Sequence, residues 1–320
     1  MKKVISGTCM ILGCFLGAGF VSGREIAFYF ARFDSGWFLS IILTVIFFFL
    51  LTMLFFKLSE KTNNFYAFSN MYFGKTSKVI SFLISICLLI ISGSMVAGTG
   101  TLAKQLGLCK FLVIVITLIL TFFIVIGNTK SISKINILLV PLLILILLIL
   151  SKFNFLENSI NAKAIISGGN YVFINITTLG MFILEIGENY SKKQKLSIVL
   201  CSSIIIGILL FGLTSAIITN NLTFDPMPNL VLANGNIILK GLIQISIYFG
   251  LFTTFIANIL VLSNYIDKFL KSKVWSILIT IFLSVIISLI GFEYIVGYVY
   301  LIIGITGMIL VFGALVKRKG

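Results

Sequence analysis

Long apolar runs separated by short polar breaks make up nearly the whole chain. These runs lie roughly at 4–31, 36–57, 78–104, 110–127, 133–151, 164–188, 195–219, 238–266, 274–291 and 294–315. A helix of about twenty apolar residues crosses the hydrocarbon core of a bilayer. The pattern therefore predicts an all-α polytopic membrane protein with ten transmembrane helices.

The distribution of basic residues supports this count. Cytoplasmic segments of membrane proteins carry an excess of Lys and Arg. With the N-terminus inside and ten alternating helices, the inner segments hold 17 of the 24 basic residues and the outer segments hold five. Arg24 and Arg32 lie toward the outer end of the first helix. This asymmetry predicts a multi-pass protein of the cell (plasma) membrane with both termini in the cytoplasm.

Composition excludes several other classes of protein. Hydrophobic residues make up 59% of the 320 residues and charged residues 10%, with a mean hydropathy of +1.19. We expect no soluble domain and no cleavable signal peptide. The net charge of +15 comes from clusters between apolar runs, so the expected partner is the lipid bilayer and not nucleic acid. The five cysteines lack metal-ligand spacing and there is no histidine, so we interpret the cysteines as packing residues.

Ten spans divide into five and five near residue 158. Because five is odd, the second half enters the membrane with the opposite orientation, which is the arrangement of an inverted-topology repeat. We therefore predict one integral membrane domain built from two five-helix repeats, 1–158 and 159–320.

Two spans at matching positions in these halves contain glycine clusters. The first carries Gly17-Ala-Gly19 about midway, and the sixth carries glycines and polar residues between Gly168 and Met181. Each Gly costs a helix about 1 kcal/mol relative to Ala. Paired Gly-interrupted segments indicate a binding site at the bilayer midplane, so helices 1 and 6 are predicted to be discontinuous. The alternative is that small residues let helices approach closely, which we favour for 92–100 in the third span.

An unwound turn exposes N–H groups at the start of one half-helix and carbonyl groups at the end of the other. The N–H end suits a carboxylate, and the carbonyl end suits a cation. In helix 1 the glycines coincide with Ser22 and with the charged pair Arg24-Glu25. This coincidence predicts that the backbone of helix 1 binds a ligand.

The sequence GAGF followed by S-G-x-E, residues 17–25, resembles the glycine-rich first-helix motif of the amino acid–polyamine–organocation superfamily. Within it, the chain is most similar to the YkvI-like amino-acid permeases. The short loops, the ten spans and the Ile-Gly-Glu-Asn-Tyr-Ser stretch at 186–191 agree with that group over nearly the whole chain. The resemblance implies the LeuT-type five-plus-five fold, with alternating access around helices 1, 3, 6 and 8.

The resemblance also implies two sets of site residues. The residues expected to bind or line the substrate are Gly17, Ala18, Gly19, Phe20, Ser22, Gly23, Asn175, Thr178 and Gly180. Those expected to bind Na⁺ through carbonyl and hydroxyl oxygens are Gly13, Leu16, Gly250, Thr253 and Thr254. The alternative for the threonines is that their hydroxyls bond to their own helix.

The coupling ion follows from a further comparison. A proton-coupled relative places a Lys in helix 5, whereas 135–150 of this chain contains none. This absence favours sodium, although Glu25 and Glu185 are ionisable groups placed for coupling or gating. For Glu185, an interfacial location is an equal alternative.

The leading hypothesis is therefore a secondary active transporter of a small neutral amino acid or similar zwitterion, coupled to Na⁺. No P-loop motif occurs, no cofactor is expected and the protein is not expected to be an enzyme. The alternatives are a proton-coupled amino-acid permease and a ligand-sensing, permease-like protein that does not transport. A metal-ion carrier is a weaker alternative, because the chain lacks the acidic, Met and His ligand motifs expected in helices 1 and 6 of such a protein.

Overall fold

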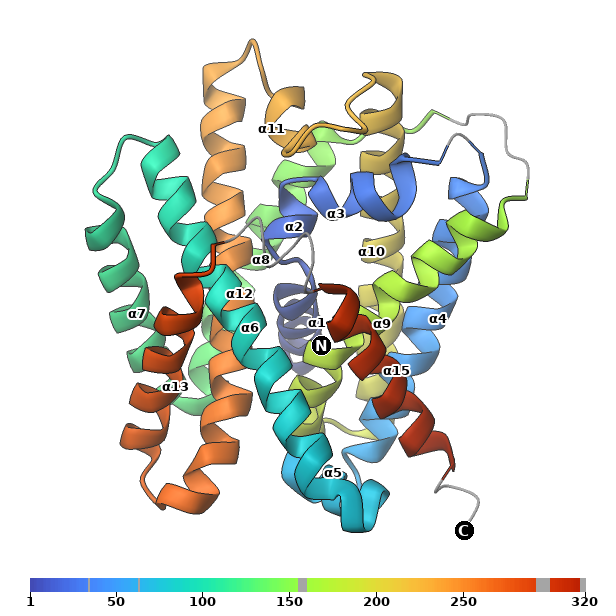
Figure 1. Ribbon diagram of the computed structural model, residues 1–320. Coiled ribbons are helices and arrows are strands. Elements are labelled where there is room, and N and C mark those ends of the chain that lie inside the picture. The colour runs from blue at the N-terminus through green and yellow to red at the C-terminus, as the bar shows by residue number, and fades with distance from the viewer. Residues whose placement is uncertain (34, 63, 155–159, 292–299, 317–320) are drawn as a thin grey trace.

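The computed structural model describes residues 1–33, 35–62, 64–154, 160–291 and 300–316, and every regular element in these ranges is a helix (Figure 1). Helices are favoured because bilayer hydrocarbon offers no partner for backbone N–H and C=O groups. Three predictions depend on residues outside these ranges. They are the boundary near 158, the start of the tenth span at 294–299, and the basic residues Lys317, Arg318 and Lys319.

The first apolar segment is divided into α1 (Lys2–Phe15), α2 (Ala18–Val21), α3 (Arg24–Ile26) and the π-helix η1 (Ala27–Ala31). The remaining helices are α4 (Trp37–Leu58), α5 (Phe65–Phe73), η2 (Gly74–Thr76), α6 (Ser77–Gln105), α7 (Lys110–Ile126), α8 (Asn128–Leu150), α9 (Ala162–Ile186), η3 (Gly187–Asn189), α10 (Lys192–Thr219), α11 (Pro228–Leu232), α12 (Ile237–Leu270), α13 (Lys273–Ser288) and α15 (Tyr300–Val316).

Six helical segments are long and apolar enough to cross a membrane by length and composition: Trp37–Leu58, Phe65–Gln105, Asn128–Leu150, Ala162–Asn189, Lys192–Thr219 and Ile237–Leu270. Shorter apolar helices lie at Lys110–Ile126, Lys273–Ser288 and Ile303–Val316. All of them fall at positions where the apolar runs predict a span. The chain is thus a multi-pass membrane protein, and the count of ten spans stays a prediction.

Side-chain caps explain where several helices begin. The side chains of Asn64, Asn161 and Asn236 accept hydrogen bonds from backbone N–H groups in the first turns of α5, α9 and α12. Ser191 and Gln194 form a capping box at the start of α10. Such caps satisfy N–H groups that have no partner inside the helix, and they therefore fix the helix starts at the polar breaks.

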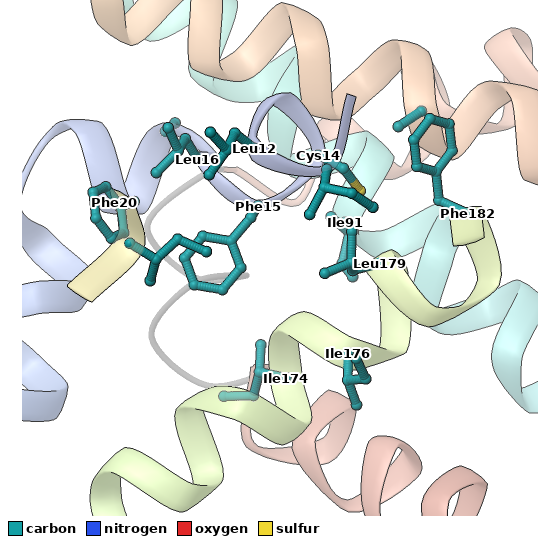
Figure 2. Packing of buried hydrophobic residues seen from close by; sticks show 14 of the residues in the cluster. Leu12, Cys14, Phe15, Leu16, Phe20, Ile91, Ile174, Ile176, Leu179 and Phe182 are labelled. Atoms are coloured by element: carbon teal, nitrogen blue, oxygen red, sulfur yellow. The ribbon is translucent and has the colours of Figure 1, made fainter. Parts of the chain in front are cut away.

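The helix α1 lies in the middle of the bundle, packed against α8, α9, α10 and α12 (Figure 1). The helix α9 packs along α4 and also against α15, while α6 packs against α12 and α13. Leu12, Phe15 and Leu16 of the first segment join Ile176 and Leu179 of α9 in one buried apolar cluster (Figure 2). This packing places the end of α1 at the centre of the protein.

An ion pair joins the ends of α4 and α10. The buried Lys195 ammonium donates to the Phe56 carbonyl oxygen at 3.2 Å and pairs with the Glu60 carboxylate at 3.1 Å. The hydrogen bond from Lys195 holds the pKa of the exposed Glu60 carboxyl group below its usual range. Lys195 thus satisfies a helix-end carbonyl group and an acidic residue at once.

The prediction that helix 6 is discontinuous is wrong. The corresponding helix, α9, runs without interruption from Ala162 to Ile186. Its polar side chains bond to its own carbonyl groups: Asn175 Nδ2 donates to Tyr171 O at 3.0 Å and Thr177 Oγ1 to Phe173 O at 3.0 Å. The polar cluster therefore needs no unwound backbone.

The glycines of α9 have a packing role instead. A Cβ atom on Gly168 would collide with the hydroxyls of Thr44 and Ser40 on α4. A Cβ atom on Gly180 would lie 2.8 Å from the ring of Phe55, also on α4. Both glycines thus permit close approach of two helices, the alternative considered for such clusters.

Candidate functional site

The break in the first segment lies at Leu16 and Gly17, as the sequence predicts. Leu16 has φ −79° and ψ 63°, and Gly17 is extended with ψ 178°. The Gly17 N–H donates to Phe15 O at 2.9 Å, whereas a continuous helix would direct it to Gly13 O. Within the described part of the chain, the carbonyl groups of Gly13, Cys14 and Leu16 accept no backbone hydrogen bond, and the N–H groups of Ala18, Gly19 and Phe20 donate none.

The helix α12 supplies a hydroxyl to the carbonyl side of this break. Thr254 Oγ1 donates to both Gly13 O and Cys14 O, each at 3.4 Å. A Cβ atom on Gly250, one turn earlier in α12, would lie 2.8 Å from Leu16 O, so only glycine allows this approach. The structure thus brings together four of the five residues predicted to bind sodium.

Thr253, the fifth, has a different environment. Its hydroxyl donates to Phe249 O at 2.9 Å and to Gly250 O at 3.4 Å, both on its own helix. This is the usual arrangement of Thr within an apolar helix. Thr253 is therefore next to the break in sequence, but its hydroxyl is engaged by the backbone of α12.

The oxygens at this break suit a hard cation. Carbonyl and hydroxyl oxygens are the ligands that such cations prefer, and oxygens about 2.4 Å from one ion at right angles stand about 3.4 Å apart. The two long hydrogen bonds of Thr254 have this spacing. Because the carbonyl groups of Gly13 and Leu16 have lost their helical donors, they are available as ligands. The residues present therefore fit Na⁺.

Two asparagines near the carbonyl side of the break were not identified as site residues from the sequence. Asn136 of α8 is buried, and its Oδ1 accepts no hydrogen bond from the described residues. This oxygen touches Gly13, where a Cβ atom would collide with it. Asn258 lies one turn from Thr254 in α12, is fully buried, and has neither amide atom bonded within the described residues. The signal was an amide side chain inside an apolar run, which is costly in a membrane.

Glu25 of α3 lies beside the N–H side of the break. A Cβ atom on Gly19 would collide with Glu25 Oε1, so the carboxyl group rests against the Gly19 backbone. Tyr171 of α9 interacts with Glu25, and its hydroxyl forms no hydrogen bond of good geometry within the described residues. The Tyr171 ring packs against Phe15 and Phe30 with ring centroids 5.8 and 5.5 Å away.

A short helix, α11, covers the C-terminal end of α2. Asn229 of α11 donates from its backbone N–H to Ser22 O at 3.0 Å and from Nδ2 to Val21 O at 2.9 Å. The turn there needs Gly23, which has φ +83° and would place a Cβ atom 2.7 Å from Asn229 Oδ1. Figure 1 shows α11 lying across this end of the bundle.

A cavity lies between α2, α6, α11 and α12, lined by residues that include Ala18, Ser22, Gly98, Thr101 and Met227. Its volume of about 10 Å³ matches roughly one water molecule. A ligand larger than a water molecule fits this cavity only if α11 or its neighbours move.

The remaining predicted site residues lie on α9, each in a different environment. Gly180 faces Phe55 of α4, and Asn175 bonds to its own helix. Thr178 is buried. Glu185, near the end of α9, accepts a hydrogen bond from Asn264 Nδ2 of α12 at 2.8 Å. The structure thus separates Glu185 from the ligand-binding region that sequence predicts.

The chain is similar in sequence to a known membrane protein. No protein-family model matches the chain. The uncharacterized membrane protein YkvI of Bacillus subtilis (strain 168) is 27% identical over 331 residues, covering 96% of this chain and 94% of YkvI. The chain is homologous to YkvI. This relationship agrees with the resemblance drawn from residues 17–25.

Solved structures extend the comparison to the fold. MhsT in complex with L-phenylalanine matches with a TM-score of 0.67 at 16% identity, covering 97% of this chain and 87% of MhsT. A Na⁺-coupled sialic acid symporter in a substrate-bound outward-open state matches with a TM-score of 0.65 at 12% identity, covering 98% and 79%. The chain has the LeuT fold.

A third structure of this fold agrees. Mhp1, a nucleobase-cation-symport-1 family transporter in a closed conformation with bromovinylhydantoin bound, matches with a TM-score of 0.62 at 12% identity, covering 89% of this chain and 70% of Mhp1. These three proteins differ in what they bind. The shared LeuT fold therefore does not identify the substrate of this chain, which has to be inferred from the site residues.

Proposed function

We propose that this protein is a secondary active transporter that carries a small neutral amino acid or similar zwitterion into the cell together with Na⁺. The observation that carries the proposal is the broken first helix, whose unpaired carbonyl groups meet Thr254 of α12 inside a LeuT-fold bundle. Unpaired backbone groups in a membrane persist only around a cavity or a ligand.

The proposal includes the membrane arrangement. Ten spans form two inverted five-helix repeats, 1–158 and 159–320, in the plasma membrane with both termini in the cytoplasm. The apolar helices and the distribution of Lys and Arg support this arrangement. Alternating access then moves the two repeats around a site in which helix 1 is interrupted and helix 6 is continuous.

The substrate carboxylate is proposed to bind at the N–H side of the break. The N–H groups of Ala18, Gly19 and Phe20 have no backbone acceptor among the described residues. Gly17 gives the chain its extended turn, and Ser22 and Gly23 fix the outer end of α2. Around this point the walls are apolar and aromatic, which favours a modest uncharged side chain.

Sodium is proposed to bind at the carbonyl side. Its ligands are the carbonyl oxygens of Gly13, Leu16 and Gly250 and the hydroxyl oxygen of Thr254, with Thr253 joining if its hydroxyl rotates away from Phe249 O. The 3.4 Å spacing around Thr254 supports this assignment. Bound Na⁺ would hold α1 and α12 together, which couples ion binding to closure of the site.

Glu25 and Glu185 are proposed as gating groups. Glu25 lies beside the break, and Glu185 joins the ends of α9 and α12 through Asn264. A proton-coupled mechanism would use one of these carboxyl groups, since α8 carries no Lys between Ile135 and Leu150.

Thermal unfolding of the purified protein tests the proposal. We expect one neutral L-amino acid to raise the Tm in NaCl and not in choline chloride, and the same amino acid to accumulate in proteoliposomes with an inward Na⁺ gradient. Binding without accumulation would identify a sensor, and dependence on a pH gradient in place of Na⁺ would identify proton coupling.

A matched pair of variants tests the carboxylate site. Gly19→Leu places a side chain against Glu25, so we expect loss of binding with normal membrane insertion. Gly169→Leu is the control, because a Cβ atom at Gly169 meets nothing within 4 Å. Normal uptake by Gly19→Leu would show that the substrate carboxylate does not bind at Gly19.

A further inference from the structure

Glu25 is a buried carboxyl group with no ion pair to a basic residue in the described part of the chain. Only 9% of the residue is exposed, and its Oε1 rests against the backbone of Gly19. Among the described residues the one ion pair is Lys195 with Glu60; the Arg32 guanidinium lies over the rings of Phe28 and Phe33 instead. A carboxyl group in such a place either takes up a proton or pairs with a cation that offsets its lost hydration.

The groups around Glu25 suit an ammonium ion. Tyr171 is 99% buried and interacts with Glu25, and its hydroxyl has no hydrogen bond of good geometry within the described residues. Its ring lies 5.2 Å from the ring of Tyr29, the two planes being tilted by 39°. A carboxylate, a hydroxyl that can accept and aromatic rings are the groups that bind organic cations in proteins.

The position of Glu25 relative to the break indicates which organic cation it can bind. In an α-amino acid, the ammonium and carboxylate groups are attached to one carbon atom, so their two subsites must adjoin. Glu25 lies against Gly19, the residue that the proposed function places at the substrate carboxylate. A cation held by Glu25 would therefore stand directly beside that carboxylate.

We propose that Glu25 binds the α-ammonium group of the substrate and so restricts transport to compounds with a free primary amine. This inference rests on the proposed function and adds the recognition of the amine. A ligand with a carboxylate alone is rejected because two unpaired carboxylates would lie side by side. The cation that Glu25 lacks is then supplied by the substrate itself.

Ligand sets that differ by one charged group test the inference. The probes are L-leucine, 4-methylpentanoate and 3-methylbutylamine, with the corresponding sets for L-alanine and L-phenylalanine. Binding of each is measured by thermal shift and calorimetry in NaCl for the wild type, Glu25→Gln and the control Glu188→Gln. Glu188 is an exposed carboxylate in η3, distant in sequence from the break.

We expect the wild type and Glu188→Gln to bind one amino acid more tightly than its desamino acid. Glu25→Gln should weaken the binding of that amino acid by about 30-fold or more, because its ammonium group loses a buried charged partner. The desamino acid should bind Glu25→Gln as well as, or better than, the wild type. Glu25→Asp, which keeps the charge, should retain part of the preference and shows that loss is not misfolding.

Other outcomes separate this inference from the proposed function. Equal binding of leucine and 4-methylpentanoate by the wild type would overturn the role of Glu25 and leave the carboxylate site standing. Binding of 3-methylbutylamine as tight as that of leucine would support Glu25 and overturn the carboxylate site. Equal weakening of all three probes by Glu25→Gln would show that Glu25 only positions α2. If none of the probes binds the wild type, both proposals fail.

Discussion

The neighbouring threonines of α12 show how one hydroxyl differs from the next. Thr254 Oγ1 is shared between Gly13 O and Cys14 O of another helix at 3.4 Å, whereas Thr253 Oγ1 bonds to its own helix at 2.9 Å. A sequence shows two adjacent hydroxyls and cannot rank them. The geometry makes Thr254 the stronger candidate ligand, because its hydroxyl leaves α12 to meet carbonyl groups freed by the break.

This difference predicts the effect of Thr254→Val. We expect the Na⁺ concentration for half-maximal uptake to rise about tenfold, equivalent to about 1.4 kcal/mol, since one oxygen ligand is replaced by a methyl group. Uptake measured over a range of NaCl at constant ionic strength gives this value. Thr280→Val, which removes a buried hydroxyl bonded to Ser276 O within α13, is the control. An unchanged sodium dependence in Thr254→Val would place the ion elsewhere.

At the scale of elements, two similar sequence patterns gave different structures. Both the first apolar segment and α9 contain glycines and polar residues midway along an apolar run. In α9 the side chains of Asn175 and Thr177 bond to carbonyl groups one turn earlier, and Gly168 and Gly180 face α4. The two segments differ in the helices that pack against their glycines. These could not be predicted, because glycine spacing alone does not show which helix packs on it.

Hydrogen exchange in detergent tests the contrast between these helices. The N–H groups of Ala18, Gly19 and Phe20 have no backbone acceptor among the described residues, whereas those in the middle of α9 belong to a continuous helix. We expect the amides at 18–20 to exchange at least about tenfold faster than those at 174–180, because helical amides exchange only through opening. Sodium and substrate should slow the first group selectively. Equal protection of both segments would contradict a break in the first helix.

For the whole molecule, much of the architecture was predictable. Bilayer thickness and the demand for internal hydrogen bonds leave few solutions for such an apolar chain, and each described helix above ten residues lies in or beside a predicted span. The contacts that join the helices near their ends were not predictable. They are made by side chains that meet across helices, such as Asn229 on Val21 O and Asn264 on Glu185. Neither asparagine belongs to a recognisable motif.

The contact between Glu185 and Asn264 joins α9 to α12, while Lys268 of α12 donates to Asn64 Oδ1 before α5 at 2.5 Å. We expect opening at this end to break both contacts, because they tie α12 to α9 and to the residue that caps α5. Asn264→Ala removes a hydrogen bond to a carboxyl group, which is typically worth about 1.5–3 kcal/mol for a charged partner. We therefore expect the open population to rise by about tenfold or more.

The native cysteines provide the measurement for Asn264→Ala. Cys14 is 5% exposed and lies just before the break, so we expect it to react with a membrane-impermeant thiol reagent only when the protein opens. In a background where the other four cysteines are serine, Asn264→Ala should raise the rate of Cys14 labelling, and Na⁺ should lower it by holding α1 against α12. Asn220→Ala, which removes an amide bonded to Ala216 O and Lys152 Nζ at the C-terminal end of α10, should leave the rate unchanged. Identical rates in the wild type and Asn264→Ala would mean that this contact does not hold the protein closed.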